Sequence, residues 1–71
     1  MESMSKESRM FGQNIKRVRT AKGISQGDIS RALKVARSFI TNLENGKANP
    51  TLATVARISK VLGVSIGELI K

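Results

Sequence analysis

Apolar residues recur at helical spacing in the first third of the chain. Phe11, Ile15 and Val18 stand at positions i, i+4 and i+7, which places them on one stripe of an amphipathic helix. The residues between them are mostly polar, and a glycine follows the stripe as a stop signal. The pattern predicts a first helix over residues 9–22, preceded by a mobile polar tail over residues 1–8.

A second, shorter apolar edge follows directly. Ser25 with Asp28 three residues later forms a capping-box pattern, although aspartate is a weaker partner than glutamate in this motif. Ile29 and Leu33 then give an apolar edge at i and i+4. We expect a helix over residues 26–33.

The next link is too short for anything but a tight turn. After residues 34–36 a third helix is expected over residues 37–45, with Ala36, Ile40 and Leu43 facing inward. A glycine ends this helix as well. Two short helices joined by three residues have the arrangement of a helix-turn-helix unit, whose second helix enters the DNA major groove.

The last part of the chain contains two more helices. Thr51 caps a fourth helix that stops at Gly63, and Ser65 with Glu68 forms a capping box for a short fifth helix over residues 66–71. The fourth helix carries its apolar residues at helical spacing, namely Leu52, Val55, Ile58 and Leu62. No segment alternates long enough to be a strand. The sequence therefore predicts an all-α fold of five short helices.

Length and composition limit what such a chain can do. Its 71 residues allow one domain, expected over residues 9–71, and a chain this short buries only about 60% of its unfolded surface. It has no Cys and no His, so thiol chemistry, the commonest zinc ligand and the usual general base are missing. We expect no enzyme activity, no catalytic residues, no metal, no cofactor and no small-molecule ligand.

The charge balance points to an anionic partner instead. Lys and Arg number 13 against 5 Asp and Glu, which gives a net charge of +8 and a pI near 11.0. Such a balance on a small domain is typical of nucleic-acid binding or of binding to an anionic surface. The sequence has neither a membrane-spanning apolar run nor a signal-peptide apolar region, so we expect no membrane partner and a cytoplasmic location.

The outward face of the third helix carries the candidate chemistry. It presents Ser38, Thr41, Asn42 and Asn45, with Arg37 at its edge. Arg can hydrogen-bond guanine O6 and N7, and Asn can hydrogen-bond adenine N6 and N7. The alternative is an ordinary solvated helix side, but such sides favour Glu and Lys over weak helix formers such as Ser, Thr and Asn. We therefore favour base contact.

The chain resembles a known family over residues 11–70. Four short motifs in register carry the resemblance: Ser25-Gln26, Leu43-Glu44-Asn45-Gly46-Lys47, Asn49-Pro50 and Leu62-Gly63-Val64-Ser65. They are similar to those of the Cro/CI-type (XRE family) helix-turn-helix domains of phage repressors, plasmid regulators and restriction–modification controllers. The resemblance implies a lambda-repressor-like fold and a sequence-specific regulator of transcription. It also implies binding of double-stranded DNA at a roughly palindromic operator as a homodimer.

The resemblance also implies a role for individual residues. The base-contacting positions would be Arg37, Ser38, Thr41 and Asn42. The phosphate-contacting positions would be Gln26, Asn45, Gly46 and Lys47, the last three through their amides and side chains. Arg19 and Glu44 would form a partly buried structural ion pair between the first and third helices. Among the other basic residues, Lys34 in the turn is the best placed to favour DNA.

Apolar residues of the fifth helix predict a dimer interface. Leu69 and Ile70 exceed what a terminal turn needs to cover its own core, whereas Ile66 is expected to complete that core. The small size of the domain also favours a second copy.

Three positions depart from the family pattern. Gly27 replaces a better helix former, and Ala36 stands where a hydroxyl or Asn often caps the third helix. Phe39 lacks the hydroxyl that a Tyr would direct at a phosphate, and we expect it to flank the core. These departures affect specificity rather than the class of protein.

Two other classes of function are alternatives to DNA regulation. An antitoxin-type interaction module would bind a protein partner first and DNA second, using the short N-terminal tail. A cationic membrane-surface peptide would need one continuous basic amphipathic helix, whereas this chain has caps and glycine stops between helices. The operator, the regulated genes and the choice between activation and repression stay open.

Overall fold

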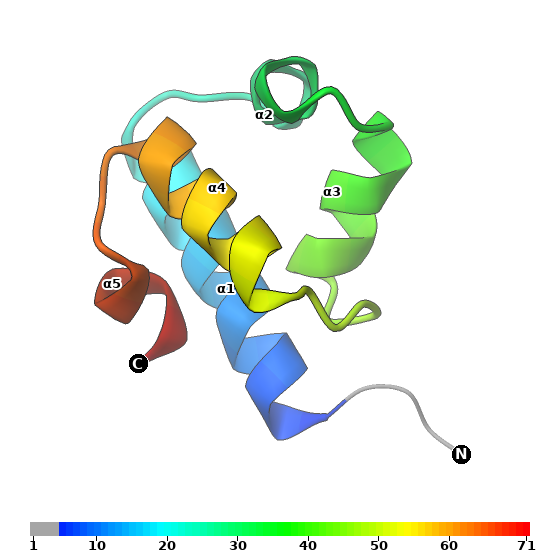
Figure 1. Ribbon diagram of the computed structural model, residues 1–71, viewed down its shortest axis with the longest axis vertical. Helices are drawn as coiled ribbons and strands as arrows, with labels where there is room; N and C mark the ends of the chain where they lie inside the picture. The colour runs from blue at the N-terminus through cyan, green and yellow to red at the C-terminus, as the bar shows by residue number, and fades with distance from the viewer. Residues whose placement is uncertain (1–4) are drawn as a thin grey trace.

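The computed structural model describes residues 5–71, which form five α-helices and no strand (Figure 1). The helices are α1 (Lys6–Ala21), α2 (Gln26–Leu33), α3 (Arg37–Glu44), α4 (Leu52–Leu62) and α5 (Ile66–Ile70). The all-α, five-helix prediction is confirmed. The part of the predicted tail at residues 1–4 lies outside the described residues. Within residues 5–71, every helix is too short or too polar to cross a membrane.

Helix α1 begins three residues before the expected start. Ser5 caps it by accepting a hydrogen bond from the Ser8 amide at 3.0 Å, and Glu7 in the first turn complements the helix dipole. Ser8 is buried, and its hydroxyl donates to the Asn49 side chain in the loop between α3 and α4. Residues 5–8 therefore belong to the folded domain, because this cap and this long-range contact extend the helix.

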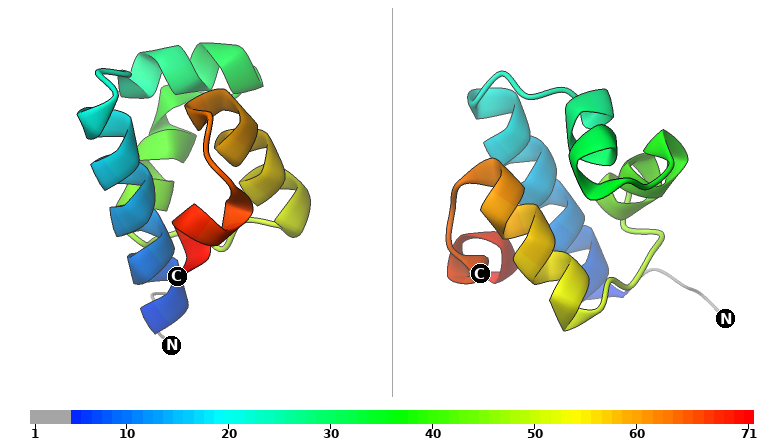
Figure 2. Two further views of the ribbon diagram at one scale, coloured as in Figure 1. Left: turned by 90° about the vertical axis from the view of Figure 1, so that its left-hand side faces the viewer. Right: turned by 45° about the horizontal axis from the view of Figure 1, so that its top comes forward.

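Helices α1 and α4 run through the middle of the molecule, with α3 on one side and α5 on the other (Figures 1 and 2). One hydrophobic core joins all five helices. Its buried members are Phe11, Ile15, Val18, Ile29, Leu33, Ile40, Leu43, Val55, Ile58, Leu62 and Leu69. Ten of them come from the helical stripes identified in the sequence, so the periodicity located most of this core.

Two positions expected to face inward are exposed. Ala36 is the N-cap of α3, and Leu52 is the first residue of α4, where its side chain remains 75% exposed. Both residues stand at the start of a helix, in a turn that does not pack against the core. Ala36 also makes no side-chain cap hydrogen bond, as expected for an alanine.

The capping box with aspartate, at α2, was expected to be weaker than the one with glutamate, at α5, but the structure shows the reverse. At α2 the box is complete, with the Asp28 amide donating to Ser25 Oγ and the Ser25 amide donating to the Asp28 carboxylate, both at 2.9 Å. At α5 the box is only half formed, because within the described residues Ser65 accepts from the Glu68 amide without a bond in return. The Glu68 carboxylate instead pairs with Lys71 at 3.5 Å.

Helix α3 lies directly against α1 because of Gly12. A Cβ atom at this position would lie 2.2 Å from the Leu43 carbonyl oxygen and 2.7 Å from that of Glu44. The two backbones therefore touch, which only glycine permits. The sequence alone does not single out Gly12, because a lone glycine inside a helical pattern gives no sign of the helix that it contacts.

Two side chains bind the C-terminal ends of the shorter helices α2 and α5. Arg57 on α4 donates to the Leu33 carbonyl at 2.8 Å and so caps the C-terminus of α2. Asn14 on α1 donates to the carbonyls of Leu69 at 2.9 Å and Lys71 at 3.3 Å. The sequence predicts neither role, since each contact joins segments that are far apart in the chain.

The fifth helix corrects half of the dimer prediction. Leu69 is completely buried in the core of the single chain and is not available to a second copy. Ile66 packs partly buried against the core, as expected. Ile70 remains 60% exposed, so it is the apolar residue of α5 that faces solvent.

Candidate nucleic-acid interface

Helices α2 and α3 are joined by a tight turn that starts in the left-handed conformation. Lys34 adopts φ 62° and ψ 45°, and its amide donates to the Arg31 carbonyl. The Val35 amide donates to the Ser30 carbonyl at 3.0 Å, which completes a turn of the Schellman type. The chain can then start α3 at Arg37, with three residues between the end of α2 and the start of α3.

The outward face of α3 carries polar side chains without partners inside the chain. Arg37, Ser38, Asn42 and Asn45 are exposed, and Lys47 follows them in the next loop. Within residues 5–71 none of these five side chains makes a hydrogen bond or an ion pair. They are therefore available to a partner, and we call them the reading face.

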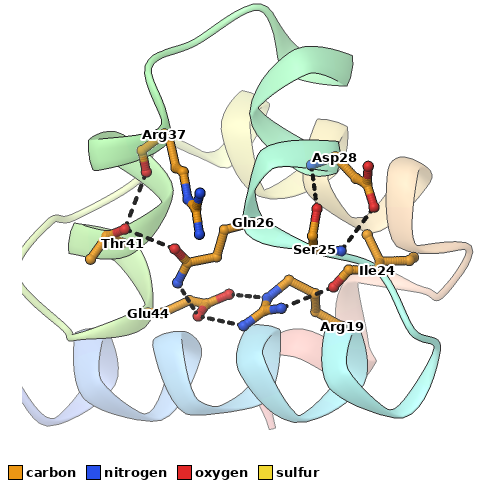
Figure 3. A network of polar contacts seen from close by, with 8 residues as sticks. All are labelled: Arg19, Ile24, Ser25, Gln26, Asp28, Arg37, Thr41 and Glu44. Carbon is orange, nitrogen blue, oxygen red and sulfur yellow. Dashed lines mark hydrogen bonds and ion pairs between the residues drawn. The ribbon is translucent and has the colours of Figure 1, made fainter.

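Behind the reading face, an ion pair joins α1 to α3 (Figure 3). Arg19 donates from Nε to Glu44 Oε2 at 2.6 Å and from Nη2 to Glu44 Oε1 at 3.1 Å, and its third contact is the Ile24 carbonyl. The Glu44 side chain is only 2% exposed. Its hydrogen bonds raise the pKa of Arg19. The ion pair expected from the resemblance is present, with two parallel hydrogen bonds.

Gln26 connects this ion pair to α3. Its Nε2 donates to Glu44 Oε1 at 2.9 Å, and its Oε1 accepts from the Thr41 hydroxyl at 2.9 Å (Figure 3). The Thr41 hydroxyl also lies 3.3 Å from the Arg37 carbonyl oxygen. Two residues assigned separately from the sequence, one to phosphate and one to bases, thus bond to each other. We call Arg19, Gln26, Thr41 and Glu44 the polar junction.

The loop after α3 corrects the role expected for its amides. The amides of Asn45, Gly46 and Lys47 donate to the carbonyls of Thr41, Leu43 and Asn42 at 2.9–3.1 Å. These amides close the end of α3 and are not free for a phosphate. Gly46 is buried at φ 75°, where a Cβ would meet Arg9, so its role is to turn the chain. Only the side chains of Asn45 and Lys47 remain available from this loop.

Two of the positions that depart from the family pattern, Gly27 and Phe39, can be compared with their surroundings in the structure. Phe39 lies partly buried against the core, as expected. At Gly27 a Cβ would lie 3.2 Å from the Arg31 guanidinium, which pairs with Asp28 at 2.6 Å. The space beside Gly27 is therefore used by a neighbouring ion pair. Lys34 is exposed in the turn, beside the reading face in sequence.

Comparison with known proteins identifies the family. The helix-turn-helix family model matches residues 15–69, which include all of α2, the turn and α3. The chain belongs to the helix-turn-helix family.

Two relatives of this helix-turn-helix chain are named as a transcriptional regulator and a control protein. It is 42% identical over 62 residues to YonR of Bacillus subtilis, a prophage-derived uncharacterized transcriptional regulator, covering 87% of this chain and 57% of YonR. It is 33% identical over 60 residues to the control protein C.MunI of a Mycoplasma species, covering 83% of this chain and 81% of C.MunI. The chain thus spans little more than half of YonR but most of C.MunI.

A solved helix-turn-helix structure has the same fold. The restriction–modification controller protein C.AhdI from Aeromonas hydrophila superposes with a TM-score of 0.85 at 29% identity. The match covers 92% of this chain and 98% of C.AhdI. The five-helix arrangement is therefore shared with this controller protein.

Proposed function

We propose that this chain is a sequence-specific regulator of transcription that places α3 in the major groove of double-stranded DNA. The observation that carries the proposal is the reading face, whose exposed polar side chains have no partner in the described chain. The net charge of +8 favours approach to a polyanion. The names of the relatives, which include regulators and control proteins, support the same class.

The reading face divides into two chemical roles. Arg37 can donate two hydrogen bonds to guanine O6 and N7, Asn42 can form a matched pair with adenine, and Ser38 can serve either base. Asn45 and Lys47 at the C-terminal end of α3 would contact phosphates and fix the register.

Gln26 is proposed as a further phosphate contact. It is the first residue of α2, where unpaired backbone amides favour an anion. Its side-chain amide has two N–H groups, and only one of them donates to Glu44. The second N–H remains for a phosphate oxygen, so the internal bond and the external contact are compatible.

A homodimer is proposed on the small size of the domain and on one apolar surface. Met10 is 40% exposed and Ile70 is 60% exposed, and both line an open pocket of about 300 Å³. The pocket is otherwise lined by Glu7, Ser8, Phe11, Asn49, Pro50 and Val55. We infer that Ile70, rather than Leu69, takes part in dimer contact. Two copies would read half-sites about 34 Å apart on a roughly palindromic operator in the cytoplasm.

In vitro selection from random duplex DNA at physiological salt tests this proposal. A symmetric motif is expected for the parent protein, since two copies read two half-sites. Arg37→Ala should weaken the best site by about 1–3 kcal/mol and relax one base position in each half. Lys47→Ala is the matched control, because it should weaken all sequences alike and reduce the salt slope by about one.

Two results would contradict the proposal. A changed base preference in Lys47→Ala would overturn the division between base-contacting and phosphate-contacting residues. Binding at low salt without any enriched motif would mean that the charge acts non-specifically. The antitoxin-type alternative would then gain, and co-purification with the product of a neighbouring gene would test it.

A further inference from the structure

The polar junction has a fixed direction of hydrogen bonding, and it begins at Glu44. A carboxylate can only accept hydrogen bonds. Glu44 accepts two from Arg19 and one from Gln26, and its side chain is almost completely buried. Arg19 supplies the compensating positive charge through their ion pair. Glu44 is therefore an acceptor with every contact defined.

The carboxylate determines which way the Gln26 amide faces. A side-chain amide has a donor end and an acceptor end. Because Glu44 can only accept, the NH₂ group of Gln26 must face it, at 2.9 Å. The carbonyl oxygen Oε1 of Gln26 is then directed at Thr41, 2.9 Å from the hydroxyl (Figure 3). The orientation of the amide follows from the chemistry of its neighbour.

Thr41 must in turn donate its only hydroxyl proton inward. Its two neighbours inside the chain are Gln26 Oε1 and the Arg37 carbonyl oxygen, and both are acceptors. Whichever of them takes the proton, none is left for a partner outside. The hydroxyl oxygen keeps a lone pair, and Thr41 is only partly buried, on the side of α3 that bears the reading face. Toward DNA, Thr41 can act only as an acceptor.

We infer that Thr41 is a specificity-determining residue that selects a base offering an amino group in the major groove. Adenine N6 and cytosine N4 are donors there, whereas thymine O4 and guanine O6 are acceptors. At the base it faces, Thr41 therefore favours adenine or cytosine over thymine or guanine. This inference rests on the proposed DNA-binding function and adds that Thr41 acts as a hydrogen-bond acceptor toward the base. Ser38 has no internal partner and carries no such restriction.

Selection with a matched pair of variants locates the base that Thr41 faces. Thr41→Val keeps the branched shape and removes the hydroxyl, so one base position should lose its preference. Thr41→Ser keeps the hydroxyl and should retain the preference. The base at that position in the parent motif is expected to be adenine or cytosine.

Removal of the amino group then tests the contact itself on the parent protein. The selected duplex is prepared with unsubstituted purine in place of adenine, or with 2-pyrimidinone in place of cytosine. The affinity of the parent should fall about five- to tenfold, the loss expected for one hydrogen bond. Thr41→Val should bind both duplexes equally, which controls for any change in the DNA. An equal loss in Thr41→Val would overturn the inference.

A change at Gln26 tests the origin of the restriction. Gln26→Met removes the nearer acceptor of the Thr41 proton, at 2.9 Å, and leaves only the Arg37 carbonyl oxygen at 3.3 Å, while keeping a side chain of similar length. The preference for adenine or cytosine at the Thr41 position should then weaken relative to the parent, beyond any general loss of affinity, because the remaining internal acceptor is the more distant one. Thymine or guanine in the parent motif, or an unchanged motif in Thr41→Val, contradicts the inference alone. Failure of the parent to enrich any motif contradicts the proposed function itself.

Discussion

The polar junction and the apolar surface around Met10 and Ile70 differ in the kind of interaction that each one provides. In the polar junction, directional hydrogen bonds connect buried or partly buried groups from α1, α2 and α3. Around Ile70, large apolar side chains remain in solvent beside an open pocket. Directional bonds define an orientation, whereas apolar contact is non-directional and depends on area. The first region therefore orients the reading face, and the second leaves surface for association.

Breaking the polar junction should have the largest effect. Glu44→Ala leaves the Arg19 side chain, which is 14% exposed, without its carboxylate, and it removes the acceptor of the Gln26 NH₂ group. We expect the free energy of unfolding to fall by about 3–5 kcal/mol, as for other broken buried pairs. Urea denaturation followed by circular dichroism measures the change.

Glu68→Ala is the control for this loss. Glu68 also belongs to an ion pair, with Lys71, but both side chains are largely exposed. Exposed pairs contribute about 0–1 kcal/mol. Equal losses in Glu44→Ala and Glu68→Ala would show that burial of the junction does not matter.

The same change at two glycines should have opposite effects in the two regions. Gly12→Ala places a methyl group 2.2 Å from the Leu43 carbonyl oxygen, so α1 and α3 must separate at a loss of about 1–3 kcal/mol. Gly67→Ala in α5 meets nothing closer than Ser65 Oγ at 3.7 Å. It should stabilise by about 0.5–1 kcal/mol, because alanine is the better helix former. Melting temperatures that shift in the same direction would refute this contrast.

Acid should produce the smallest of these effects, at the start of α2. The Ser25 backbone amide donates to the Asp28 carboxylate and holds the pKa of that group below its usual value of 3.8. A lowered folded pKa means that this stabilisation is present above pH 3.8 and is lost as pH falls through the folded pKa. Asp28→Ala should therefore be less stable than the parent at pH 6, with the difference shrinking at pH 2. A difference that stays constant with pH would contradict this origin.

Helix positions followed from the sequence because caps, stops and apolar spacing are local signals. The expected and observed bounds of α2 coincide, since Ser25 and the following apolar edge act within one turn. Leu52 shows where this reasoning ends. Periodicity places it on the correct stripe, but only the three-dimensional packing shows that the first turn of α4 extends past the core.

The part of the site that could be predicted from the sequence is the part whose side chains make no hydrogen bond to other residues of the chain. Arg37, Ser38 and Asn42 are exposed without internal partners, as a face calculated at 100° per residue suggests. The bond between Gln26 and Thr41 joins two helices across 15 positions, and no spacing rule gives a donor and acceptor at that separation. The misjudged loop amides have the same cause, because the ends of α3 compete with any ligand for them.

The contact at Gly12 also bears on how this domain would fit its target. Backbone touching backbone leaves no soft layer of side chains between α1 and α3, so α3 cannot tilt toward α1. Because α3 is held rigidly, the DNA duplex has to deform to fit it, and the bending and groove width of DNA depend on sequence. Base pairs that the protein never touches would then influence affinity through their stiffness.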